Sequence, residues 1–214
     1  MPSYNLAVGH DTAPYVWVYP WNVGLKYQNP PIATPIMGTG RGLAWSPDGK
    51  LLAIAHDNSP SISVYNFTAG FGSRYTSPDE SVRGNGKSVA WGPFLSGTTI
   101  PQSLLDIAIA NTTTPFLSTY LWTIGTGYAG IHPNPTTIPT GSGNGVAFTF
   151  DIAAGTIPDI AIAHTTSPFV SAYSYSIGSV AGNPFGAKYA NPATLPAGTG
   201  NSVAFLPGGA DLAV

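Results

Sequence analysis

Apolar and polar residues alternate in short runs along the whole chain, and the runs end at glycine, proline, asparagine or aspartate. Alternation with a period of two is typical of β-strands, and clusters of those four residue types are typical of turns. A helical period is not sustained over more than one turn anywhere. The pattern therefore predicts an all-β protein built from short strands and tight turns.

The expected strands recur in a fixed order. A phrase of the form Leu/Ile-Ala-Val/Ile-Gly/Ala-His/Asn starts at Leu6, Leu52, Ile107 and Ile160, with a further copy at Leu212, at spacings of 46 to 55 residues. Three other phrases accompany it, at residues 16–19, 62–65, 117–120 and 170–173; 40–45, 86–91, 143–148 and 200–205; and 26–30, 74–78, 131–135 and 188–192. Four short strands in about 40–50 residues are the unit of a β-propeller blade. We therefore expect a β-propeller of four-stranded antiparallel blades, with about four blades in this chain.

We expect a single repeat domain over residues 1–214. Blade boundaries fall near 1–38, 39–84, 85–141 and 142–198, and residues 199–214 begin a further blade. Because the chain begins and stops inside the same phrase, a ring of four blades would contain one strand too many. Two interpretations are open: the sequence is part of a longer repeat protein, which the interrupted phrase favours, or the ring closes between chains.

The second repeat carries a family resemblance. Residues 43–65 read Leu-Ala-Trp-Ser-Pro-Asp-Gly-Lys-Leu-Leu-Ala-Ile-Ala-His-Asp and end on Ile-Ser-Val-Tyr, which resembles the WD-repeat and YVTN-like β-propeller families. Tyr-Pro, Tyr-Asn, Tyr-Leu or Tyr-Ser stands where the WD repeat has Trp-Asp. The polar phrasing of residues 188–205 is most similar to uncharacterised propeller-like repeat proteins of tailed bacteriophages. That resemblance implies a structural or host-binding role on a virion.

Charge is scarce in this chain. Charged residues make up 7% of the 214 positions, against roughly 25% in a typical soluble domain. The net charge of −2 and the lack of a basic stripe argue against nucleic acid as a partner. The chain contains no cysteine and no apolar run of the roughly 18 residues that a membrane span needs. We expect no membrane insertion and a location on a virion or outside the cell, with the cytoplasm left open.

Three of the four histidines occupy one position of the repeat. His10, His56 and His164 follow the second-strand phrase, and Asn111 stands there in the third repeat. One ligand per blade would be too widely spaced for a shared metal ion, so we expect each side chain to satisfy polar groups at the strand end. The next position carries Asp11 in the first repeat and Asp57 in the second, and we expect both carboxylates to accept backbone N–H groups in the turn.

The glycine-rich loops before each first strand are interpreted as turns. A phosphate-binding loop needs a helix behind it, and here a strand follows. Within these loops Arg41, Lys87, Asn144 and Asn201 share one position and differ between repeats. A rim position that varies while its neighbours stay constant is a candidate for binding specificity.

Two tryptophans and three aspartates complete the candidates. Trp17 and Trp21 flank an expected turn and have no counterpart in later repeats. Such aromatics stack on sugar rings, although packing between blades is the favoured alternative. Asp106, Asp159 and Asp211 precede the second strand and are expected to protect strand edges from pairing.

The chain shows no Ser-His-Asp set, no HExxH motif and no DxDxDG run. We therefore expect a non-enzymatic protein with no cofactor and no metal, which serves as a structural or adhesive part of a larger assembly. Its expected partners are copies of itself, other assembly proteins or surface glycans. The alternatives are a lectin-like, carbohydrate-binding propeller and, with less support, a lactonase-type hydrolase with a central metal held by acids from several blades.

Overall fold

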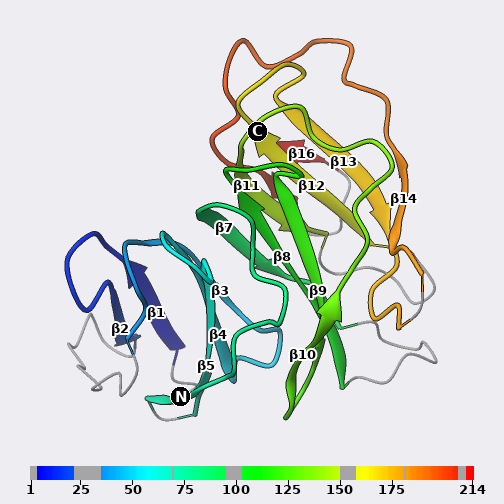
Figure 1. Ribbon diagram of the computed structural model, residues 1–214. Helices are drawn as coiled ribbons and strands as arrows, with labels where there is room; N and C mark the ends of the chain where they lie inside the picture. The colour runs from blue at the N-terminus through cyan, green and yellow to red at the C-terminus, as the bar shows by residue number, and fades with distance from the viewer. Residues whose placement is uncertain are drawn as a thin grey trace.

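The computed structural model describes residues 4–21, 35–68, 70–94, 103–149, 158–180, 182–206 and 211–214. Within these residues every regular element is a β-strand, and the strands form three four-stranded antiparallel sheets and two two-stranded ones (Figure 1). The all-β prediction is confirmed. No helix long and apolar enough to cross a membrane occurs in the described parts of the chain.

The sheets follow one another along the chain, and the strands of each sheet are paired in chain order. The two-stranded sheets hold β1 (Tyr4–Gly9) and β2 (Val16–Trp21), and β15 (Ala204–Phe205) and β16 (Leu212–Ala213). The four-stranded sheets hold β3 (Gly40–Trp45), β4 (Leu51–His56), β5 (Ile62–Phe67) and β6 (Phe71–Arg74); β7 (Gly86–Trp91), β8 (Leu104–Asn111), β9 (Leu117–Thr123) and β10 (Gly127–Ile131); and β11 (Gly143–Phe148), β12 (Asp159–His164), β13 (Val170–Tyr175) and β14 (Phe185–Lys188).

The three four-stranded sheets share one register. In each, the glycine that opens the first strand pairs with the last residue of the second strand, and the pairing then shifts by one residue at a β-bulge. The pairs are Gly40 with His56, Gly86 with Asn111, and Gly143 with His164. The sequence repeat is therefore also a repeat of backbone geometry.

The hairpin turn expected at residues 46–50 is present. Gly49 adopts φ of 69°, which an asparagine or glycine tolerates best. The Ser46 amide donates to the Leu51 carbonyl over 2.9 Å, and the Lys50 amide donates to Asp48 Oδ1 over 3.1 Å. The Asp-Gly pair thus reverses the chain between β3 and β4.

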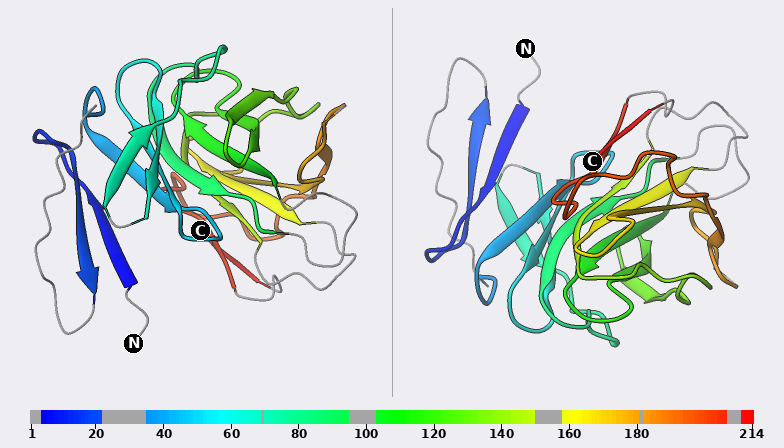
Figure 2. Two further views of the ribbon diagram at one scale, coloured as in Figure 1. Left: turned by 90° about the horizontal axis from the view of Figure 1, so that it is seen from below. Right: turned by 90° about the horizontal axis from the view of Figure 1, so that it is seen from above.

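The first strands of successive sheets lie next to one another. β3 packs between β1 and β7, and β11 packs between β7 and β15. Figure 2 shows the sheets fanning out in chain order without closing into a ring. This arrangement is propeller-like, and small side chains suit its crowded inner part: Ala53, Ala108 and Ala161 are all fully buried in the second strands.

The hydrophobic core lies between the sheets. One cluster joins Leu51 and Val64 to Trp91 and Trp122, and so fills the space between the sheets β3–β6 and β7–β10. A second cluster joins the sheet β7–β10 to Phe148 and its neighbours in the sheet β11–β14. The sheet β7–β10 is therefore covered on both faces.

Candidate binding site

The histidines of the second and fourth repeats are bonded inside their own sheets. His56 Nε2 lies 3.0 Å from Ser63 Oγ, and its Nδ1 lies 2.9 Å from the Asp57 carbonyl. His164 Nε2 lies 3.1 Å from Ser171 Oγ. Burial lowers the pKa of both imidazoles, so both are neutral at pH 7. The expectation that they satisfy polar groups at the strand end is confirmed for these two, whereas His10 Nε2 is buried without a hydrogen-bond partner among the described residues.

The other two members of this position use different partners. The Asn111 amide is hydrogen-bonded with Ser118 Oγ over 3.2 Å, so an amide replaces the imidazole against the same serine position. In the first repeat Trp17 stands where the later repeats have that serine, and the His10 ring stacks on it at 6.0 Å. The position is therefore a structural link between neighbouring strands of one sheet.

Arg41 forms an ion pair instead of standing free on the rim. Its Nη2 lies 2.8 Å from Asp57 Oδ2, and its Nε also donates to this carboxylate. These hydrogen bonds hold the pKa of Asp57 below its usual value, with a smaller contribution from the charge of Lys87. The expectation that the Asp57 carboxylate accepts turn amides is wrong, because in the described structure its oxygens accept hydrogen bonds from the Arg41 guanidinium and from no backbone amide.

The remaining rim candidates lie at the same position of later sheets. Asn144 Nδ2 donates to the Gly200 carbonyl over 3.0 Å and so links two successive repeats. Lys87 is half-buried and Asn201 is exposed. The structure brings Lys87 near the Arg41–Asp57 pair, and a binding role for these four residues stays a prediction.

The structure describes the side chain of Trp17 but not that of Trp21. Trp17 is half-buried and stacked on His10, so its ring packs within the first sheet. Trp21 is the last residue of β2, and its side chain lies outside the described residues. A sugar-stacking role for the pair stays a prediction.

The prediction that Asp106 protects a strand edge is wrong, because this residue is fully buried in β8. Its Oδ1 lies 2.8 Å from His132 Nε2, and its Oδ2 accepts the Gly178 amide over 2.8 Å. The hydroxyl of the nearby Tyr175 is buried without a hydrogen-bond partner, and burial raises its pKa. Asp106 therefore joins the central sheet to the next one.

The Asp106–His132 pair has a counterpart in the next sheet. Asp159 begins β12 as Asp106 lies near the start of β8, and its Oδ1 accepts the Tyr189 hydroxyl over 2.7 Å. His132 and Tyr189 also make equivalent backbone contacts. The His132 amide donates to the Thr119 carbonyl in β9, and the Tyr189 amide donates to the Ala172 carbonyl in β13. An acid bonded to the residue after the fourth strand thus recurs in two of the three four-stranded sheets, whereas Leu51 stands at this position in the sheet β3–β6. This recurrence supports a structural role for the buried pair.

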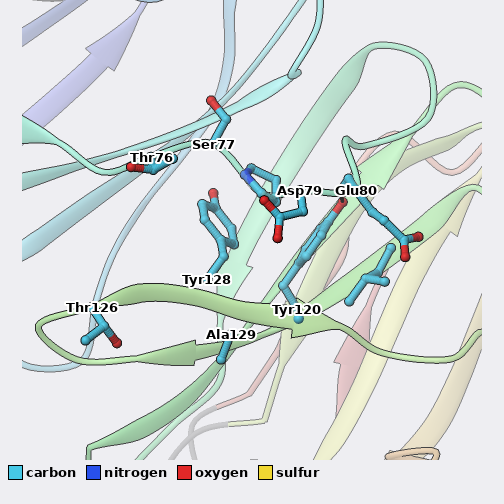
Figure 3. Close-up of a pocket in the computed structure, with 11 residues that line it drawn as sticks. Thr76, Ser77, Asp79, Glu80, Tyr120, Thr126, Tyr128 and Ala129 are labelled. Atoms are coloured by element: carbon cyan, nitrogen blue, oxygen red, sulfur yellow. Dashed lines mark hydrogen bonds between the residues drawn. The ribbon is translucent and has the colours of Figure 1, made fainter.

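A cavity of about 250 Å³ lies between the segment 76–80 and the hairpin of β9 and β10. In Figure 3 the Asp79 side chain points into this space, where the rings of Tyr120 and Tyr128 rise from the hairpin strands. The Tyr120 hydroxyl donates to the Glu80 carbonyl over 2.8 Å and fixes the segment on the sheet. Burial raises the pKa of Tyr128 well above its usual value, and its hydroxyl has no partner among the described residues.

A second cavity of about 330 Å³ adjoins the first. Arg83, Ser118, His132 and Asn134 are among its lining residues. Glu80 and Ile131 line both cavities, so the two are neighbours with a shared part of their walls. We call these two neighbouring cavities, lined by residues of the segment 76–83 on one side and by Tyr120, Tyr128 and residues 131–134 on the other, the 76–83 groove.

Sequence reasoning missed this groove, although the chain carried a signal for it. Asp79, Glu80 and Arg83 place three charges within five residues of a chain that is 7% charged. All three are exposed, and none forms a hydrogen bond or ion pair through its side chain with another described residue. In the described ranges, no three His, Cys, Asp or Glu side chains gather to hold a metal ion.

No protein-family model and no curated protein matches the chain. Among solved structures, the chain is similar to one described as "Structure of U3-55K", with a TM-score of 0.43 and 12% sequence identity. The similarity covers 77% of this chain and 42% of that one, so this chain spans less than half the length of that protein.

Proposed function

We propose that this protein is a non-enzymatic β-propeller repeat protein that serves as a structural or adhesive component of a larger assembly, such as a phage virion or an extracellular fibre. The observation that carries the proposal is the use of the repeated polar side chains. His56, Asn111 and His164 each bond to a serine of the neighbouring strand. Groups that could do chemistry are thereby engaged in holding the strands of each sheet together, which is what a scaffold requires.

In this proposal the four-stranded sheets are propeller blades. Their common register and the adjacency of β3, β7 and β11 support that assignment. Self-association of these blades is part of the proposal. Light scattering on the purified protein tests it, because self-association gives a mass at least twice that of one chain.

The adhesive role is tested with fluorescently labelled protein applied to a panel of bacterial and animal cells and to purified phage particles. We expect saturable retention on at least one of these surfaces. In parallel, the same preparation is incubated with lactones and with phosphate and carboxylate esters, and we expect no turnover. Hydrolysis that co-elutes with the protein, or no retention on any surface together with a monodisperse monomer, would overturn the proposal.

A further inference from the structure

We infer that the 76–83 groove binds a short saccharide. This inference rests on the proposed adhesive function and names the class of ligand that the adhesive surface recognises. It stands on the two adjoining cavities and on charged side chains that the fold itself does not use.

The repeats provide an internal comparison for the groove. The Tyr120 hydroxyl donates to the Glu80 carbonyl over 2.8 Å, and the Tyr173 hydroxyl donates in the same way to the Thr137 carbonyl over 2.7 Å. The backbone contact is therefore common to both sheets, while the side chain changes from carboxylate to hydroxyl. Because the contact forms with a neutral residue, the fold does not need the Glu80 charge.

The same comparison extends to the other two charges. Counted back from the glycine that opens the next sheet, Asp79 corresponds to Thr136 and Ala193, Glu80 to Thr137 and Thr194, and Arg83 to Thr140 and Ala197. All three charges of the groove thus stand where the two later repeats have threonine or alanine. These side chains are charged where the later repeats have neutral residues, and in the described structure they form no side-chain hydrogen bond or ion pair. They are therefore available to a ligand.

Polar groups beneath the charges also lack partners. Tyr128 lines the first cavity, and its hydroxyl is buried without a hydrogen-bond partner among the described residues. Such groups are rare in folded proteins unless water or a ligand satisfies them. In the second cavity, His132 Nε2 is occupied by Asp106, so Nδ1 is the ring nitrogen left for a ligand.

The mixture of groups favours a neutral polyhydroxyl ligand. Asp79 and Glu80 oppose an anion, whereas Arg83 opposes a cation. A saccharide uses both signs, since carboxylates accept hydrogen bonds from its hydroxyls and the guanidinium donates to its oxygens. The cavities of about 250 and 330 Å³ lie near the lower end of small-molecule sites. Because Glu80 lines both neighbouring cavities, the groove suits a few linked sugar units.

The test applies the purified protein to a glycan array of bacterial and animal surface oligosaccharides, followed by calorimetry with the strongest binder. The variants carry residues that other repeats hold at the same positions: Asp79→Ala, Glu80→Thr and Arg83→Ala. Asp11→Thr is the matched control, because it removes an exposed carboxylate from the first sheet where later repeats have Thr112 and Thr165. We expect each groove variant to weaken binding by about tenfold, the scale of one hydrogen bond to a charged group, and the control to bind normally.

Thermal melting of every variant shows whether it folds, and we expect unchanged midpoints. The inference fails if no glycan binds, if the groove variants bind as well as the wild type, or if Trp17→Ala abolishes binding while the groove variants do not. Retention on cells that survives all three groove variants would leave the adhesive proposal standing and overturn the saccharide groove. Enzymatic turnover would overturn the proposed function itself.

Discussion

At the scale of single residues, the glycine that opens each sheet is required by a contact with the preceding sheet. A Cβ added to Gly40 would lie 2.6 Å from the Tyr15 carbonyl oxygen, and one added to Gly143 would lie 2.5 Å from that of Phe116. On Gly86 it would meet the corresponding oxygen of Ser61, and on Gly200, which precedes β15, it would meet that of Phe169. The glycine phrase was interpreted as a turn signal, and the structure adds that these glycines let backbones of neighbouring sheets approach.

We expect Gly86→Ala to lower the free energy of unfolding by about 2 kcal/mol, the middle of the range for overpacking a tight site. The added methyl group would overlap the Ser61 carbonyl oxygen, which belongs to backbone and cannot rotate away. Urea unfolding followed by tryptophan fluorescence measures the loss. Gly198→Ala is the control, because its Cβ would meet no atom within 4 Å. Equal stabilities of the two variants would contradict this contact.

The buried histidines predict a pH dependence of stability. Burial lowers the pKa of His56 in the folded state, whereas in the unfolded chain it keeps its usual value near 6.5. As pH falls below that value the unfolded state binds the proton first, so stability is complete at higher pH and decreases with acidification. His56→Asn, which copies Asn111, should show a shallower loss between pH 7.5 and 5 in urea unfolding. An unchanged slope would show that His56 titrates alike in both states.

At the scale of elements, β8 and β12 place an aspartate at matching positions but in different surroundings. Asp106 is fully buried and bonded to His132 and the Gly178 amide. Asp159 is half-buried and bonded to the exposed Tyr189. The difference arises because the segment after β13 covers Asp106, and no later segment among the described residues covers Asp159 in this way.

This difference predicts unequal costs for the same substitution. Asp106→Ala should lower the free energy of unfolding by about 3 kcal/mol or more, because it leaves a buried imidazole and a buried amide unpaired. Asp159→Ala should cost about 1 kcal/mol or less, since water replaces the lost hydrogen bond. Chemical denaturation of both variants measures the two costs. Similar values would mean that Asp106 is accessible to water in solution.

Much of the sheet structure could be predicted from the chain, because strand periodicity and turn residues are local signals. The Asp-Gly turn between β3 and β4 and the shared register of the repeats are examples. The burial of Asp106 could not be predicted, since it depends on Gly178, which is 72 positions away. The 76–83 groove was missed for a related reason: it forms where a segment of one repeat crosses the strands of the next, and only the charges at Asp79, Glu80 and Arg83 marked it.

At the scale of the whole molecule, the protein is a row of sheets that are held together by hydrophobic packing between neighbouring sheets. Trp91 shows how one side chain connects two repeats. Its ring packs edge-on against Trp122 at 5.3 Å, and its Nε1 donates to the Ala44 carbonyl in β3 over 3.1 Å. In repeat architectures of this kind, interface interactions between neighbours set how far unfolding spreads.

Trp91→Ala should therefore destabilise two sheets together. We expect a loss of about 3–5 kcal/mol, as for other large aromatic truncations in a core, and faster amide hydrogen exchange in both β4 and β8. Phe185→Ala is the control, because Phe185 packs on Tyr173 and Tyr175 in the outer part of the sheet β11–β14, and its effect should stay in that sheet. Trp91→Phe, which copies Phe148, should restore most of the protection while losing the bond to Ala44. Exchange that accelerates in β8 alone after Trp91→Ala would show that each sheet unfolds independently, since a shared interface must expose both of its sides at once.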